Sequence, residues 1–362
     1  MDPDLASDLD LDELDELDEL DELDELDELD ELDELEDLSE QDIQEITGLL
    51  FELKRAKPAD KLSRVEASAR KARAHSDRVM DDTQMKPAVA LYGALAAGIA
   101  ASFARQFRGN AREPIHAATA THALGIASAQ LGRFGSQLGA ALRRSTRSVV
   151  VEGYTSAATF MRSMLRGPSP LDDRATAQRA VRARTQELVP LRAQSAQDIS
   201  RDITDILRAR LQNMTFDVGA TVTDLINETH EFLDLELWRI ERLVRTETSY
   251  AYNVALAEAH KTLAKVPGFG ALRSRWTELV DDLTRMPLDR RVGKDSIVLH
   301  GQVTRPGGVF TMPPGADVPR HLAGRSWSHP PNRPNDRAIL IPWMPDWGVP
   351  AWVYRSGASV QL

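Results

Sequence analysis

The chain has 362 residues, a net charge of −12 and no cysteine. This length suits two domains and a tail, and the lack of cysteine excludes disulfides, thiolate metal sites and cysteine nucleophiles. Residues 1–45 contain 25 Asp and Glu and no Lys or Arg, so the remainder is basic, with 44 Lys and Arg against 31 acids. An acidic segment ahead of a basic body indicates a nucleic-acid partner or a charged tail that shields the basic surface.

Residues 1–38 form an acidic leader, in which the tripeptide Asp-Glu-Leu occurs eight times in succession from Asp12 to Leu35. A period of three advances about 300° around an α-helix, so successive leucines move round the helix and form no lasting apolar face. The paired acids also repel each other. We expect a disordered leader. It is either a passive solubilising tail or a polyanion that covers the basic body or docks on a basic protein.

From about Ser39 to Leu263, apolar residues recur at spacings of three and four, which predicts a series of helices. We expect an elongated helical region over 39–167 and a long-helix region over 168–266. Helix boundaries are predicted at five prolines, Pro87, Pro114, Pro168, Pro170 and Pro190. The uncharged stretch between Lys86 and Arg105 consists mostly of Ala and Gly, which favours a tightly packed soluble helix over a membrane span.

Arginine side chains cluster along the expected helices, and arginine suits planar, bidentate contact with phosphate. No aromatic platform is interleaved with them, so we expect no base readout. They are either ordinary solvated surface or nonspecific contacts to the backbone of double-stranded DNA. The candidates for DNA contact are Arg143, Arg144, Arg147, Arg179 and Arg182.

The composition changes after Val266, because 12 of the 19 prolines and five of the six tryptophans follow it. Short apolar runs such as SIVLHGQV and RAILIPW alternate with Pro and Gly turns. This pattern predicts a small α+β module over 267–362. The expected fold is therefore mainly α, with an elongated helical part followed by this module.

A series of loose motifs extends from Trp238 to Trp343: a helix WRIERLVRTETSYAYNVALAEA, a tryptophan, then DRRVGKDSIVLHGQV, GGVFTMPPG and SHPPNRPNDRAILIPW. Their order and spacing resemble the phage minor head protein family, which has a Mu F-like head morphogenesis domain. The matching positions are Arg245, Glu247, Trp276, Asp289, Arg291, Gly301, Pro334, Asn335, Asp336 and Arg337. The chain departs from the family pattern at Ser296 and His300, and at Ala338, where many members have a cysteine.

The resemblance implies a minor capsid protein that helps to assemble the head of a tailed phage. Such a protein would bind the portal region and other head proteins, contact packaged double-stranded DNA, and aid assembly or genome ejection. It would be present in several copies inside the virion and in the host cytoplasm during assembly, with no enzymatic activity and no cofactor. The alternative is a metal-dependent nuclease or toxin-like enzyme on the same scaffold. A weaker third option is an ejection protein whose Ala/Gly-rich helix enters a membrane.

Arg245 and Glu247 lie two residues apart on the expected helix, so they point in different directions. We expect them to clasp the C-terminal module, Glu247 through Arg291 and Arg245 through Asp289. Tyr250 and Tyr252 are expected to pack in the core beside Trp276.

Two further groups of side chains are candidates for function. Trp347 and Trp352 lie in a loop-rich terminus, where exposed aromatics commonly anchor a partner. His300, His321 and His329, together with Asp289 and Asp336, contain enough donors for a metal ion. Their spacings are irregular and match no metal-binding motif, so we expect no metal site.

Overall fold

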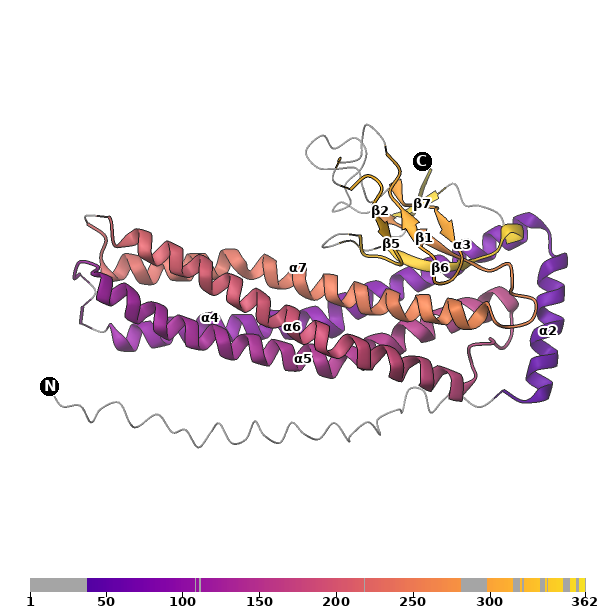
Figure 1. The fold of residues 1–362 in the computed structure, drawn as a ribbon, viewed down its shortest axis with the longest axis horizontal. Coiled ribbons are helices and arrows are strands. Elements are labelled where there is room, and N and C mark those ends of the chain that lie inside the picture. Colours follow the sequence, from indigo (N-terminus) through magenta and orange to yellow (C-terminus); the bar gives the residue numbers. More distant parts are fainter. Residues whose placement is uncertain are drawn as a thin grey trace.

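The computed structural model describes residues 38–107, 109–110, 112–217, 219–280, 298–314, 320, 322–332, 336, 338–347, 352–355 and 358–361. It is mainly α-helical with a small strand-containing module near the C-terminus, which confirms the expected fold class (Figure 1). The helical elements are α2 (Glu40–Arg55), α3 (Pro58–Arg78), the π-helix η3 (Val79–Met85), α4 (Lys86–Gln106), α5 (Ala117–Leu165), α6 (Arg174–Met214) and α7 (Val222–Leu263).

Local sequence signals fix several helix ends. Ser39 caps α2 and Thr221 caps α7, each in a reciprocal capping box with the aspartate three residues later. The side chain of Asp173 accepts the backbone N–H of Thr176 at the start of α6. Helix α5 ends at Leu165, and its C-cap residue Arg166 has a φ of 63°, in the left-handed region. The linker predicted after Leu165 therefore joins α5 to α6.

The helix boundary predicted at Pro190 is wrong, because this proline lies inside α6. Leu188 and Arg192, on either side of it, are both buried in the helical bundle. Pro190 itself is exposed. Tertiary packing of the flanking residues thus outweighs the roughly 3 kcal/mol by which a proline disfavours a helix interior.

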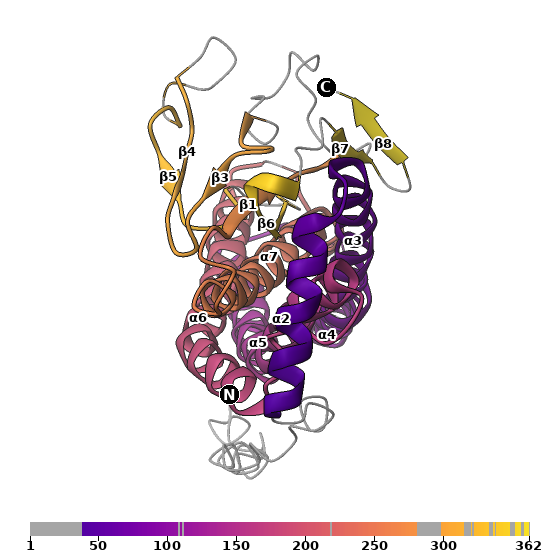
Figure 2. The same cartoon turned by 90° about the vertical axis from the view of Figure 1, so that its right-hand side faces the viewer.

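The three longest helices, α5, α6 and α7, contain 49, 41 and 42 residues and lie side by side (Figure 1). At 1.5 Å per residue they are about 60 to 75 Å long. The rod formed by α3, η3 and α4 completes the bundle, and α2 crosses one end of it (Figure 2). Helices α5 and α7 approach closely at Gly153, where a Cβ would lie 2.6 Å from the carbonyl oxygen of Tyr252.

The bundle has two apolar cores separated by a polar layer. One core contains α4 with the adjoining halves of α5, α6 and α7, and the other contains α2, α3, the opposite halves of the long helices and the C-terminal module. Both cores take residues from either side of residue 168, so the helices before and after that position pack as one bundle. The polar layer consists of the buried side chains Gln84, Thr146, Arg192 and Thr248.

The module lies over α7 and α3, near the end of the bundle where α2 crosses (Figures 1 and 2). Its main sheet has the antiparallel order β3-β1-β6. A second sheet has the order β2-β7-β8, and β4 pairs with β5. The strands are β1 (Arg273–Thr277), β2 (Leu279–Val280), β3 (Val303–Thr304), β4 (Phe310–Thr311), β5 (Ser326–Trp327), β6 (Ile339–Trp343), β7 (Trp352–Arg355) and β8 (Ala358–Gln361), with a 3-10 turn η4 (Pro345–Trp347) after β6.

Helix α4 is less enclosed than its sequence predicts. One face, which includes Tyr92, Ile99 and Phe103, is buried in the bundle. The opposite face is solvent-exposed and made of alanine and glycine, so only 28% of its most apolar window is buried. By length and composition alone, α4 is long and apolar enough to cross a membrane, with a mean hydropathy of 1.6.

Candidate assembly site: helix α7 and the C-terminal module

Helix α7 holds strand β6 through one asparagine side chain. The Asn253 amide donates to the carbonyl oxygen of Ala338 at 3.0 Å, and its Oδ1 accepts the backbone N–H of Leu340 at 3.0 Å. One turn earlier on α7, the hydroxyl of Ser249 donates to the carbonyl oxygen of Asp336 at 3.1 Å. Asn253 and Ser249 are buried, so these bonds are formed away from water and their loss would leave buried backbone groups unpaired.

Asp336, one of the positions matched to the head protein family, shapes the turn that leads into β6. Its carboxylate accepts the backbone N–H of Asn332 at 2.9 Å and that of Ala338 at 3.0 Å. The side chain is buried. These bonds place the carbonyl groups of Asp336 and Ala338 where α7 binds them. Asp336 is thus a structural residue of the contact with α7.

Trp276 and Gly301, two further matched positions, join β1 to the segment before β3. The backbone N–H of Gly301 donates to the carbonyl oxygen of Trp276 at 2.8 Å. Gly301 has a φ of +81°, a conformation that favours glycine. The buried indole of Trp276 donates to the Glu278 carboxylate at 2.8 Å, and the Glu278 backbone N–H donates to Nδ1 of His300 at 3.1 Å. His300 is therefore part of this structural network.

Two histidines lie in the contact between α7 and the module. His260, on α7, is fully buried, and its Nδ1 lies 2.9 Å from the hydroxyl of Ser274 on β1. Burial lowers the pKa of His260 to about 3, so it is neutral at physiological pH. The ring of His329 packs edge-on against Tyr250 of α7, with ring centroids 4.8 Å apart. Burial also lowers the pKa of His329.

Arg291, the expected partner of Glu247 in the clasp, lies outside the described residues. Among the described residues, the Glu247 carboxylate faces α6. It accepts a hydrogen bond from the hydroxyl of Ser195 on α6 at 2.8 Å. Glu247 lies on a different side of α7 from Ser249 and Asn253, which contact the module. Arg245 is half-buried on α7. Three expected members of the clasp, Asp289, Arg291 and Arg337, lie outside the described residues.

The polar layer between the two cores centres on Arg192, which is fully buried. Its guanidinium donates to the Thr146 hydroxyl at 3.0 Å and makes longer contacts with Gln84 at 3.4 Å and Thr248 at 3.5 Å. Burial lowers the pKa of Arg192 to about 10, while the charge of Glu247 acts in the opposite direction. Burial raises the pKa of Glu247. The matched helix of the family resemblance is therefore tied to α5 and α6 as well as to the module.

The prediction of an exposed Trp347 is wrong. Its side chain is 1% exposed, because the turn η4 folds it into the core that the module shares with α3. The turn is also held by an ion pair of 2.7 Å between Asp346 and the buried ammonium of Lys61 on α3. Trp352 begins β7. Among the tryptophans whose burial the structure describes, Trp238 is the one that is largely exposed.

Trp238 lies on α7 and is 47% exposed. The guanidinium groups of Arg239 and Arg242 lie 5.1 and 5.6 Å from its ring centre. Leu235, one turn earlier, is 52% exposed. An exposed aromatic flanked by arginines and an aliphatic side chain has the composition of a protein-binding hot spot. The sequence does single out Trp238, because it is the only tryptophan before Val266. Helical periodicity alone does not predict that it lies on an exposed face of α7.

The candidate DNA-contacting arginines form two separate groups. Arg143 and Arg144 are exposed on α5, whereas Arg147 is half-buried. Arg179 and Arg182 are exposed on α6. Because Thr146 contacts Arg192, the first group lies at the level of Arg192, about 15 Å along the bundle from Arg182.

Within the described residues, no group of three or more potential ligand side chains could hold a metal ion. His300 and Asp336 each bind backbone groups of the module, and His329 bonds to the carbonyl of Pro330. The other two candidate ligands, Asp289 and His321, lie outside the described residues.

Comparison with known proteins found no match to this chain among protein families, curated proteins or solved structures.

Proposed function

We propose that the protein is a minor capsid protein of a tailed phage or prophage, bound near the portal inside the head, where it aids head assembly or genome ejection. The order of motifs from Trp238 to Trp343 is the basis of this proposal. The observation that best supports it is the docking of the C-terminal module on α7 through Asn253 and Ser249. The matched residues Trp276, Gly301 and Asp336 all serve this docking or the fold of the module.

The proposed role is structural and non-catalytic. A bundle about 60 to 75 Å long, with a module fastened to one side, presents a large and rigid surface to neighbouring head proteins. On this surface, the patch of Leu235, Trp238, Arg239 and Arg242 is the proposed anchor for the portal or another head protein. The chain acts in several copies per virion, with no cofactor, and reaches the head from the host cytoplasm.

Packaged DNA is the second proposed partner. Arg143, Arg144 and Arg182 are exposed, with no ion pair or hydrogen bond to their side chains from the described residues. Such groups can contact phosphates without reading bases, and their affinity for DNA would fall steeply with salt.

If a portal protein is encoded beside this chain, binding between the two proteins tests the proposal. The full-length chain should co-purify with the portal protein, and Trp238→Ala should weaken that binding by tenfold or more with little effect on thermal stability. Phe216→Ala is the matched control, since Phe216 is an aromatic side chain 82% exposed on the segment after α6, and it should bind as the wild type does. No binding by the wild-type chain, or equal losses in both variants, would count against the proposal.

A further inference from the structure

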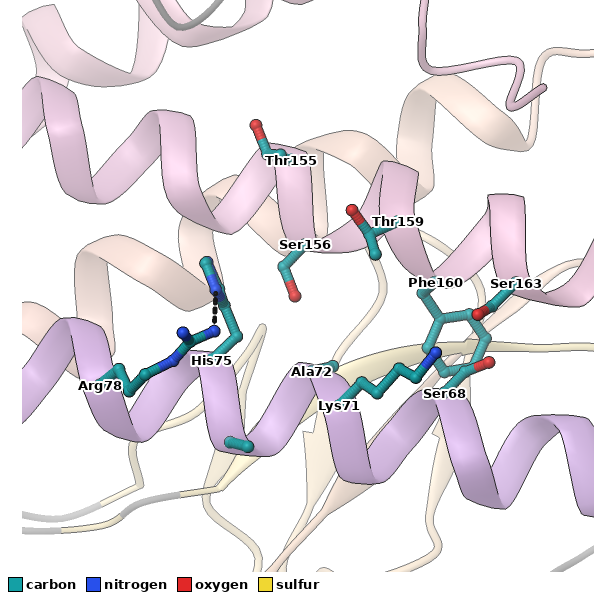
Figure 3. A pocket seen from close by; sticks show the side chains of 11 residues that line it. Ser68, Lys71, Ala72, His75, Arg78, Thr155, Ser156, Thr159, Phe160 and Ser163 are labelled. Carbon is teal, nitrogen blue, oxygen red and sulfur yellow. Dashed lines mark hydrogen bonds between the residues drawn. The ribbon is translucent and has the colours of Figure 1, made fainter. Parts of the chain in front are cut away.

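A groove of about 320 Å³ lies between α3 and α5, on the helical bundle (Figure 3). Helix α3 contributes three basic side chains to it, Lys71, His75 and Arg78. Helix α5 contributes a row of small hydroxyl side chains and the ring of Phe160. The floor of the groove is formed by Phe160 together with alanines of α3 and is largely apolar. The three basic side chains of α3 form its rim.

The basic rim is not neutralised by the described parts of the chain. Lys71 and Arg78 are exposed, and the structure pairs neither with a carboxylate in the described residues. Arg78 instead lies 3.5 Å from Nδ1 of His75, as Figure 3 shows. The carboxylate of Glu152 on α5 already has a partner, because its Oε2 lies 2.6 Å from Nε2 of His75. A ligand with negative charge would therefore meet two cations that are available to bind it.

Basic charge continues past the end of the groove. The guanidinium of Arg64 donates to the carbonyl oxygen of Met164, one residue beyond Ser163 in the groove. Burial and the charge of Arg166 both lower the pKa of Arg64, whereas the charge of Asp60 acts in the opposite direction. An extended acidic segment would meet basic side chains over the full length of the groove and beyond it.

We propose that this groove binds the acidic leader of the same chain, through its Asp-Glu-Leu repeats at residues 12–35. The leucines supply apolar contacts for the floor at Phe160, and the acids pair with Lys71 and Arg78 at the rim. A nucleic-acid backbone supplies the charge but no apolar group for the floor. The repeat matches both properties of the groove, and the proposal does not depend on the head-protein function.

The leader is long enough to reach the groove. Helix α2 begins at Glu40, five residues after the last repeat, and is about 24 Å long. Lys71 lies about 20 Å along α3 from its first residue. The 24 residues of the repeat span up to about 80 Å when extended. Because leader and groove belong to one chain, their effective concentration is in the millimolar range, so even a weak contact is populated.

Engineered cysteine pairs in the full-length chain test this binding, because the natural chain has no cysteine. One variant carries Leu23→Cys with Thr159→Cys, which lines the groove. The matched control carries Leu23→Cys with Ser136→Cys, exposed on the same helix about 35 Å away. Under mild oxidation at low salt, we expect the groove pair to form at least fivefold more intramolecular disulfide than the control pair.

Charge variants separate binding from chance collision. In the variant with Leu23→Cys and Thr159→Cys, the disulfide yield should fall at least fivefold when Lys71→Glu and Arg78→Glu are added. It should fall by less when the added changes are Lys71→Gln and Arg78→Gln. Arg105→Glu with Arg133→Glu, which changes two exposed arginines elsewhere on the bundle, should leave the yield unchanged. Thermal unfolding checks that each variant is folded. Equal yields at positions 159 and 136, or no loss in either Lys71/Arg78 variant, would overturn the proposal.

Discussion

Asn253 on α7 pairs with the backbone of Leu340 on β6 as a neighbouring strand would, since its Oδ1 accepts the Leu340 N–H at 3.0 Å. The amide of the same side chain donates to the carbonyl of Ala338. One helical side chain thus satisfies two buried backbone groups of a strand. This arrangement fixes the position of the strand on the helix, because a shift of β6 by one residue would leave these groups unpaired.

Asn253→Ala should destabilise the protein by about 2 to 6 kcal/mol, because it removes the partners of two buried backbone groups at about 1 to 3 kcal/mol each. Urea unfolding followed by circular dichroism measures the change. Asn213→Ala is the control, since Asn213 is exposed near the end of α6, and its effect should stay within about 0.5 kcal/mol. A similar small effect of Asn253→Ala would show that the module is held mainly by apolar packing.

Arg192→Leu should lower the free energy of unfolding by about 1 to 3 kcal/mol, because it removes the buried hydrogen bonds to Thr146 and Gln84 and a charge that favours the ionised Glu247 carboxylate. Adding Glu247→Gln should recover part of this loss, since glutamine can still accept the hydrogen bond from Ser195. A double-mutant cycle in urea measures this coupling. Arg182→Leu, at an exposed position of the same helix, is the control. Strictly additive losses would contradict the proposed coupling between Arg192 and Glu247.

Acid should destabilise the protein through His260. Its pKa is about 3 in the folded protein and about 6.5 in the unfolded chain, so between these values only the unfolded chain takes up the proton. The free energy of unfolding should therefore fall as the pH drops below about 6.5, by up to about 1.4 kcal/mol per pH unit from this residue. Above that pH, His260 is neutral in both the folded and the unfolded chain, so it should add no pH dependence to the free energy of unfolding.

Unfolding of His260→Gln between pH 4 and 8 measures this contribution. Glutamine keeps a polar group beside Ser274 but does not titrate, so the variant should show a shallower loss of stability in acid. His329, whose pKa is also lowered by burial, should supply part of the remaining slope. A variant with the same pH dependence as the wild type would show that His260 is not a significant source of acid sensitivity.

Arg143→Gln with Arg144→Gln should weaken binding to double-stranded DNA and reduce its salt dependence. Removing one contact to a phosphate should lower the slope of log affinity against log salt by about 0.9. Arg201→Gln with Arg208→Gln is the matched control, because these arginines already pair with Asp198 and Asp205. Fluorescence anisotropy with a random duplex at several salt concentrations gives both quantities. Equal slopes for the two double variants would remove the assigned role of Arg143 and Arg144.

Much of the fold could be predicted from local sequence. Apolar periodicity predicts the helical region, and the composition change after Val266 marks the start of the module. These predictions succeed because helix formation and turn chemistry depend on neighbouring residues. Pro190 shows the limit of such reasoning, because burial of the residues on either side keeps the helix intact through it.

The details of the site depend on contacts between distant positions, which one sequence does not reveal. Arg192 reads as one of many arginines on α6, and its burial depends on Gln84 and Thr146, far earlier in the chain. Trp347 reads as an exposed aromatic in a proline-rich tail, but η4 turns it into the core. In the same way, Asn253 is not one of the positions that the family resemblance matches, and its role depends on a strand 85 residues later.

We propose that the chain is a structural protein of a tailed-phage head. Quantitative mass spectrometry of phage heads purified from cells that carry this gene tests the proposal most directly. We predict several copies of the wild-type chain per head. The double variant Asn253→Ala with Ser249→Ala, which releases the module from α7, should be absent from heads even though its helical bundle stays folded. Absence of the wild-type chain from filled and empty heads, together with metal-dependent nuclease activity of the purified protein, would contradict the account.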